Sequence, residues 1–314
     1  MTVSADVRIQ LRKTKRVRKF KRAGFIVAML SVAMLNFLVF YLFVNFRSIL
    51  MAFQLTDLAG NVTYSMHNFS MLFKELTLSD SIMMIAIKNT LTYFAVSLLV
   101  ITPLSLVFSY FLFKQIRGYR FFRIVFFLPS IINAVVLVIL YREMVSVNGP
   151  LFALLKSIFG MGEYDVPELL ADSRYATPTI IAYCIWTGFG VNLILFNGAM
   201  TRIPEDVIEY GRLEGVGIFR ELFAIMIPMI WPTLSTIIIF ASVGIFSAGG
   251  PILLFGTNGE FKTWTISYFI FDQVFTRQIY EYASAVGLFF SAIGLPVVLL
   301  VRFFLTRIGT EVEY

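Results

Sequence analysis

The chain has 314 residues, of which 58% are hydrophobic and 14% charged. This composition excludes a water-soluble globular domain, because no soluble core of this size needs so much apolar sequence. The formal net charge is +7, but the basic residues adjoin apolar runs. That placement favours a membrane topology signal and contact with anionic lipid over nucleic-acid binding.

Six apolar runs are each long enough to cross about 30 Å of hydrocarbon as a helix. Because backbone groups in lipid must be hydrogen-bonded internally, these runs predict an all-α polytopic membrane protein. The predicted spans are about 24–46, 89–113, 123–141, 177–198, 226–249 and 284–304. They form a membrane domain, 24–305, between a basic N-terminal tail, 1–23, and a C-terminal tail, 306–314.

The basic residues also predict the orientation of the chain. They crowd two places, the segment before the first span and the short link between the second and third spans. These residues are Arg8, Arg12, Lys13, Lys15, Arg16, Arg18, Lys19, Lys21, Arg22, Lys114, Arg117, Arg120 and Arg123. Acidic residues outnumber basic ones in the three longer links. The positive-inside rule therefore places both termini in the cytoplasm.

Two links on the outer side each favour a short helix. One covers the mildly apolar stretch 71–76, and the other covers 149–160, where leucines recur at helical spacing. Prolines at Pro103, Pro129, Pro232 and Pro296 fall within predicted spans, and we expect them to kink or interrupt the helices.

A polar segment, 201–223, separates the fourth and fifth spans on the predicted cytoplasmic side. Glu205 and Asp206 suit the positive end of a helix dipole that begins after Pro204. Gly215 and Gly217 then permit a sharp reversal at positive φ. The segment therefore predicts two short helices around a glycine turn, which is either a plain connector or a docking element for a soluble partner.

The spacing of Glu209, Glu214-Gly215, Phe219 and Pro228 resembles the EAA loop of ABC importer permeases. The resemblance implies the type I importer fold in a bacterial inner membrane. It also implies two permeases, here a heterodimer, with two ATPase subunits and an extracytoplasmic solute-binding protein. The residues it assigns to ATPase coupling are Glu209, Tyr210, Gly211, Glu214, Gly215, Phe219 and Pro228. Tyr210 and Gly211 depart from the family's two alanines.

Other stretches are similar to the carbohydrate class of these permeases. They are 121–130, which contains Phe-Phe-Arg and Leu-Pro-Ser, then Ser-Ala-Gly-Gly-Pro at 247–251 and Tyr-Ala-Ser-Ala at 282–285. This resemblance implies a sugar or oligosaccharide as the solute, with phosphate, polyamine or peptide as alternatives. A self-contained secondary transporter is a further alternative. It is disfavoured because the spans contain almost no ionisable residue apart from Arg123 and Arg302.

In this family the translocation path runs between the two permeases, along the third to fifth spans. Polar and aromatic residues there are candidates for contact with a sugar, since aromatic rings stack on its C–H faces and amides bond its hydroxyls. These are Asn133, Tyr183, Trp186, Asn192, Phe246 and Ser247. Packing between helices is the alternative role for each of them.

The sequence gives little support for ATP hydrolysis, metal binding or a reactive thiol in this chain. There is no G-x-x-x-x-G-K-[ST] motif, so we expect ATP and Mg²⁺ on a partner ATPase and no enzymatic activity in this chain. His67 is the sole histidine and lacks a second imidazole for a metal site. Cys184 is the sole cysteine, and we expect a packed thiol there.

Overall fold

The computed structural model describes residues 5–57, 60–159, 168–246, 250–257, 260 and 262–308. The chain divides into two compact units, Met1–Asn68 and Phe69–Tyr314.

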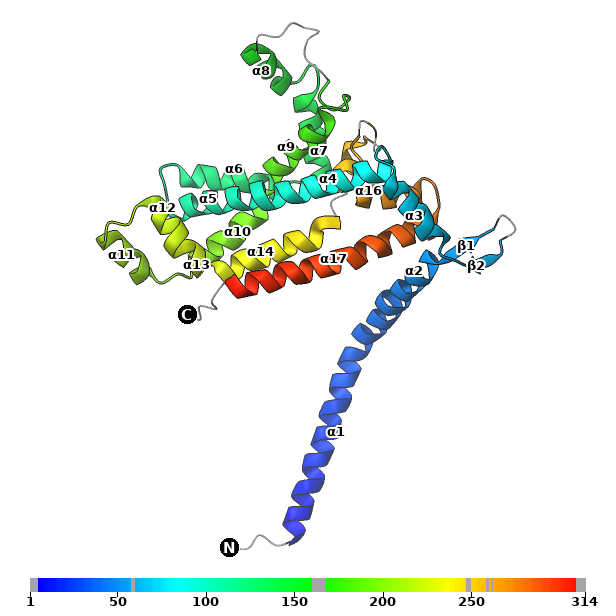
Figure 1. Cartoon of the computed structure of the whole chain (residues 1–314). Helices are drawn as coiled ribbons and strands as arrows, with labels where there is room; N and C mark the ends of the chain where they lie inside the picture. Colours follow the sequence, from blue (N-terminus) through cyan, green and yellow to red (C-terminus); the bar gives the residue numbers. More distant parts are fainter. Residues whose placement is uncertain are drawn as a thin grey trace. The chain divides into compact units, whose positions relative to one another are not determined.

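The first unit is dominated by one uninterrupted helical segment (Figure 1). It runs through α1 (Ala5–Asn36), a π-helical stretch η1 (Phe37–Phe43) and α2 (Val44–Ala52). Almost every side chain from 21 to 50 is exposed within the unit, although the segment is apolar on all faces. A helix that is apolar all round needs an apolar solvent. This segment therefore provides the first span, and its helix begins well inside the basic N-terminal tail.

A small hairpin follows, which the sequence analysis did not anticipate. Strands β1 (Gln54–Thr56) and β2 (Val62–Tyr64) pair antiparallel. The side chain of Asn68 is buried and donates hydrogen bonds to the carbonyl oxygens of Ala52, at 3.1 Å, and Gln54, at 2.8 Å. These two bonds connect Asn68 to the end of α2 and to the start of β1.

The second unit is helical. Its elements are α3 (His67–Thr77, which begins at the boundary of the units), α4 (Ile82–Val96), π-helical η2 (Ser97–Ile101), α5 (Thr102–Phe113), α6 (Tyr119–Ile131), α7 (Ala134–Val145), α8 (Pro150–Phe159), α9 (Ala176–Thr187), α10 (Phe189–Met200), α11 (Glu205–Leu213), α12 (Ile218–Arg220), π-helical η3 (Glu221–Met226), α13 (Ile227–Met229), α14 (Trp231–Val243), 3₁₀-helical η4 (Gly244–Phe246), α15 (Gly250–Phe255), α16 (Ile266–Phe275) and α17 (Tyr280–Ile308). Helices are present where the sequence predicts short ones, at 71–76 and 149–160, as α3 and α8.

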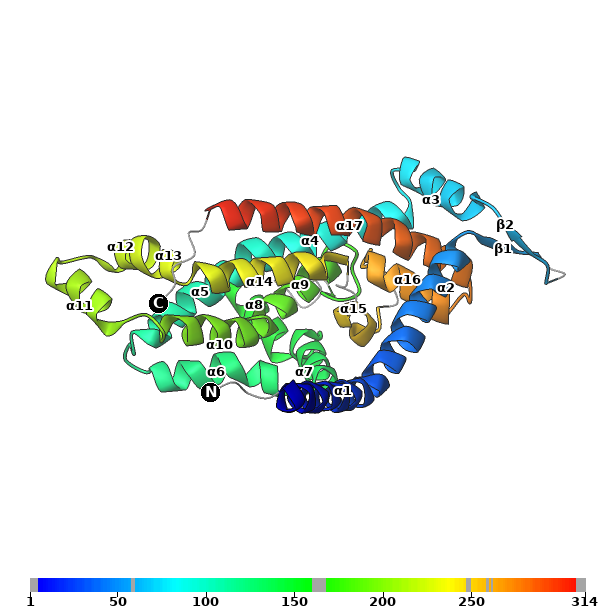
Figure 2. The ribbon, with the colours of Figure 1, turned by 90° about the horizontal axis from the view of Figure 1, so that it is seen from below.

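Long helices of the second unit pack side by side, with α5 against α10 and α14 against α17 (Figures 1 and 2). Hydrogen bonds between helices support both pairs. The Ser109 hydroxyl donates to the carbonyl oxygen of Leu193 at 3.2 Å, and the Trp231 indole N–H donates to that of Leu305 at 3.2 Å. Such bonds hold membrane helices together where the hydrophobic effect is weak.

The two ends of this bundle carry different elements. Helices α11 and α12, the link between α5 and α6, and the last turn of α17 lie at one end (Figure 1). Helices α15 and α16 lie at the other end, as the view from below also shows (Figure 2). The segment resembling the EAA loop is therefore on the same side of the bundle as the basic link 114–123.

Among the described residues, five helices are long and apolar enough to cross a membrane. A sixth span results if the helices Ile218–Met229 and Trp231–Phe246, bent by 77°, are counted together. The bend adjoins Pro232, whose missing N–H removes a helical hydrogen bond. Pro296, by contrast, lies inside α17 without ending it.

The third predicted span, 123–141, differs from expectation because it is not one helix. Helix α6 contains Pro129 and ends at Ile131, and Ile132 is extended, with ψ of 141°. The Asn133 side-chain oxygen then accepts a hydrogen bond from the N–H of Val135 at 2.9 Å and starts α7. The long apolar helical segment in this region is Ala134–Ile158. An N-cap inside an apolar run divides the span.

Candidate functional site

The polar segment between the fourth and fifth spans folds as predicted, as helices around a glycine turn. Helix α11 has Pro204 as its N-cap and acidic residues in its first turn, and it ends at Leu213. Gly215 adopts φ of +70°, and the N-cap of α12 is Gly217, in extended conformation. A side chain at Gly215 has open space around it but an unfavourable backbone conformation. The reversal therefore depends on glycine at that one position.

One face of the segment anchors it to the bundle. Ile208 on α11 is 7% exposed and shares a buried cluster with Met200, Leu222 and Met226. A Cβ atom at Gly211 would lie 3.3 Å from the Ile225 side chain, so α11 also approaches η3 closely. The position of α11 is thus fixed by apolar packing.

The opposite face leaves large apolar side chains in the open. They are exposed by more than half of their surface, and we call them the apolar coupling surface: Tyr210, Leu213, Ile218, Phe219 and Phe223. Phe219, for example, is 79% exposed. Glu209 and Glu214 are exposed beside them. A cluster of apolar side chains on a polar segment at the end of a bundle is typical of a protein-interaction site.

Glu209 also lines a hollow of about 430 Å³ between the end of α5 and α11. Other polar side chains around it come from both elements, namely Lys114, Gln115, Thr201, Glu205 and Arg212. This hollow gives the segment a charged recess next to the apolar coupling surface.

A buried ion pair, which the sequence analysis missed, connects this segment to the second span. Lys114 Nζ at the end of α5 lies 2.5 Å from Glu221 Oε1 at the start of η3. Only 19% of the lysine side chain and 8% of the glutamate side chain are exposed. Charged groups are this buried only when they are paired. Opposite charges next to the ends of two different predicted spans were the available signal, but the sequence does not show that these two residues pair.

Two of the predicted path residues lie together near the other end of the unit. The rings of Tyr183 and Trp186 are 6.3 Å apart, and both face Tyr141, at 5.3 and 6.2 Å. Phe255 of α15 closes the group, 5.2 Å from Tyr183. Tyr183 is only 5% exposed. Cys184 packs against the same cluster, as predicted for a structural thiol.

The remaining path candidates lie elsewhere in the unit. Asn133 is exposed and caps α7, and Asn192 is half-buried on α10. Phe246 of η4 is half-buried, with its ring 5.4 Å from that of Phe290. Ser247 is outside the described residues. The described candidates therefore form one aromatic pair and three separate positions.

Comparison with known proteins identifies the family. The profile of the family described as "Binding-protein-dependent transport system inner membrane component" matches residues 101–310. The chain belongs to this family. The match covers α5 to α17 and so includes the EAA-like segment and the basic link. Like other members, the chain is an inner-membrane component of a binding-protein-dependent transporter.

Individual relatives cover nearly the whole chain. The diacetylchitobiose uptake system permease protein NgcF of Streptomyces coelicolor is 26% identical over 90% of this chain and 83% of its own length. The polygalacturonan/rhamnogalacturonan transport system permease protein YteP of Bacillus subtilis is 25% identical over 96% and 95%. The multiple sugar-binding transport system permease protein MsmF of Streptococcus mutans is 22% identical over 87% and 92%.

A solved structure supports the fold. A chain in the crystal structure of a bacterial ABC transporter that imports the acidic polysaccharide alginate superposes with a TM-score of 0.80. The match covers 94% of this chain and all of that chain, at 23% identity. The fold is therefore that of an ABC importer permease.

Proposed function

We propose that this chain is one of a pair of permeases in an ATP-driven importer of a sugar or oligosaccharide. The partners are a second, homologous permease, two ATPase subunits that bind ATP and Mg²⁺, and an extracytoplasmic solute-binding protein. The observation that carries the proposal is the apolar coupling surface on an anchored helix pair at one end of the bundle. An element with one fixed and one exposed apolar face can transmit the movement of a docked subunit to the spans.

The orientation follows from charge. Lys114, Arg117, Arg120 and Arg123 belong to the bundle end that also carries α11 and the last turn of α17. The positive-inside rule assigns this end to the cytoplasm, where ATPase subunits reside. The C-terminus is then cytoplasmic, and so is the N-terminus, because the basic tail precedes the first span.

The solute class rests on the named relatives. NgcF is named for the uptake of a saccharide, YteP and MsmF are named for saccharide transport systems, and the structurally similar transporter is involved in the import of alginate. A sugar passing between two permeases needs aromatic faces and hydrogen-bonding amides. Trp186 and Asn192 are half-buried and so offer such groups. If they line the path, Trp186→Ala and Asn192→Ala lower uptake while the complex still assembles.

Docking is tested by co-purification of the ATPase with variants of the coupling segment. We expect Glu209→Lys and Phe219→Ser each to reduce ATPase recovery at least fivefold, since one reverses a charge and the other removes a 79% exposed ring. Gly215→Val should act similarly, because a β-branched residue resists φ of +70°.

The matched control is Tyr64→Ser, which removes a 66% exposed ring on β2, an element that is not part of the coupling segment. Its ATPase recovery should equal that of the unmodified chain. Unchanged recovery and unchanged transport in all three coupling variants would make the segment a plain connector and refute the proposal.

A further inference from the structure

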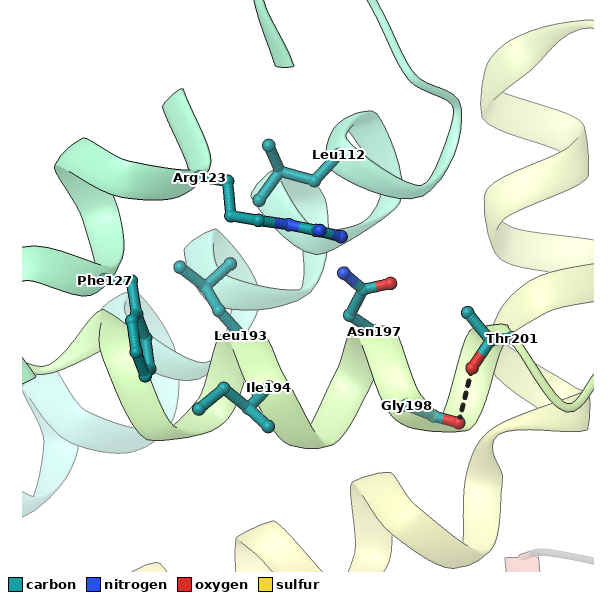
Figure 3. A pocket seen from close by; sticks show the side chains of 8 residues that line it. All are labelled: Leu112, Arg123, Phe127, Leu193, Ile194, Asn197, Gly198 and Thr201. Atoms are coloured by element: carbon teal, nitrogen blue, oxygen red, sulfur yellow. Dashed lines mark hydrogen bonds between the residues drawn. The ribbon is translucent and has the colours of Figure 1, made fainter. Parts of the chain in front are cut away.

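A second hollow, of about 430 Å³, lies between α5, α6 and α10 (Figure 3). Its walls are mainly apolar and come from Leu112, Phe127, Leu193 and Ile194, and Gly198 leaves room on α10. Three polar side chains complete the lining, namely Arg123, Asn197 and Thr201. The hollow thus combines an apolar wall with one positive charge.

Within the part of the chain that the structure describes, no acidic side chain pairs with the charge in this hollow. In Figure 3 the Arg123 side chain extends from α6 toward the amide of Asn197 on α10. Neither of the ion pairs among the described residues involves Arg123. Arg120, one turn earlier, instead donates from Nε to the Tyr119 hydroxyl at 3.2 Å. The guanidinium of Arg123 is therefore available to an anion from outside the chain.

The depth of the hollow in the membrane follows from its lining. Arg123 belongs to the first turns of α6, directly after the basic link, and Thr201 follows the last residue of α10. The start of α6 and the end of α10 lie at the bundle end that carries α11 (Figure 1). An arginine at this level reaches the phosphates of the inner leaflet, while the apolar wall stays at the level of the acyl chains.

We propose that this hollow binds an anionic phospholipid of the inner leaflet, with the lipid phosphate on Arg123 and an acyl chain against Phe127 and Ile194. Basic pockets between helices on the cytoplasmic side are suited to such headgroups. The planar guanidinium can donate two parallel hydrogen bonds to a phosphate. The inference does not depend on the solute class or on ATPase docking.

An oligosaccharide fits the same hollow poorly. A sugar needs many hydrogen-bonding partners, whereas the wall here is mostly hydrocarbon. The Thr201 hydroxyl also already donates to the Gly198 carbonyl oxygen, at 3.0 Å. The apolar wall therefore matches an amphiphilic anion better than a hydroxyl-rich solute, whether that solute is neutral or acidic.

Native mass spectrometry of the purified transporter complex, titrated with phosphatidylglycerol or phosphatidylcholine, tests the proposal. We expect a preference for phosphatidylglycerol that Arg123→Gln weakens about tenfold, equivalent to about 1.4 kcal/mol. Arg123→Lys should retain part of the preference, because an ammonium keeps the charge but loses the bidentate geometry. Gly198→Leu should also weaken binding by filling the hollow, since the space around Gly198 is open.

The matched control is Arg117→Gln, which removes a charge from the same link but does not line the hollow. Its lipid affinity should stay within twofold of the unmodified complex. Equal losses in the Arg117 and Arg123 variants would mean diffuse electrostatic attraction, and no loss in either would mean no site. Displacement of the bound lipid by an oligosaccharide would assign the hollow to the translocation path. Each of these three results overturns the proposal.

Discussion

Breaking the buried pair between Lys114 and Glu221 should destabilise the end of the bundle that carries the coupling segment. Removing one partner of a buried ion pair costs about 3–5 kcal/mol, because the other charge stays buried without compensation. Lys114→Met leaves the glutamate, whose side chain is 8% exposed, whereas Glu221→Gln leaves the lysine, which is 19% exposed and can reach water more easily. We therefore expect the lysine variant to be the more destabilised of the two.

The effect should extend to function, because the pair joins α5 to η3. The π-helical stretch η3 directly follows the short helix α12, which carries part of the apolar coupling surface. In both variants we expect ATPase subunits to co-purify, since that surface is intact, but more ATP to be hydrolysed per solute imported. This combination distinguishes a loosened coupling segment from failed docking, in which the ATPase is lost altogether.

The assay measures thermal unfolding of the purified complex and the ratio of hydrolysis to uptake in proteoliposomes. The reversed pair, Lys114→Glu with Glu221→Lys, is the decisive variant, since it restores opposite charges at the same two positions. It should recover at least half of the stability lost by the worse single variant. Losses in the reversed pair that equal the sum of the two single losses, or single losses below about 0.5 kcal/mol, would refute the reasoning.

Four further variants, of which Gly198→Ala is a control, test the packing of the second unit. Gly190→Ala places a Cβ atom against the Ser130 side chain, and this overpacking should lower the free energy of unfolding by about 1–3 kcal/mol. Gly198→Ala, on the same helix, meets open space and should leave thermal unfolding unchanged. Asn89→Ala removes two hydrogen bonds to carbonyl oxygens in the link before α16, at 2.7 and 2.8 Å, and should cost about 1–3 kcal/mol. Tyr141→Phe removes the hydroxyl donor to a buried carbonyl oxygen, so a smaller loss, about 1 kcal/mol, should appear in the same measurement.

The sequence was sufficient wherever one strong physical constraint governed a segment. Lipid demands long apolar helices, so the six runs predicted an all-α fold. The turn at Gly215 was predictable because glycine adopts positive φ at no steric cost. Each of these inferences needs only neighbouring residues.

What the sequence left open depends on competition between local interactions or on contacts between distant segments. Hydropathy alone made 123–141 a single span, but the side-chain cap of Asn133 after Pro129 starts a new helix. The Lys114–Glu221 pair joins segments far apart in the sequence, and no spacing or motif in the sequence predicts that these two residues pair. The path candidates stay predictions for the same reason, because the sequence gives the chemical type of each residue but not the surface that it faces.

These physical constraints bear together on how the coupling end works. A docked subunit can move the spans only if the docking element is firmly attached to the bundle. The apolar anchor at Ile208 and the ion pair at Glu221 hold α11 and η3 on either side of Gly215. A Cβ atom at Gly215 would meet no neighbouring atom within 4 Å, so no other element packs against the turn at that position. We therefore propose that force applied at Phe219 reaches the bent fifth span through η3 and reaches α5 through Lys114, so that the ion pair is a second route of coupling besides the continuous chain.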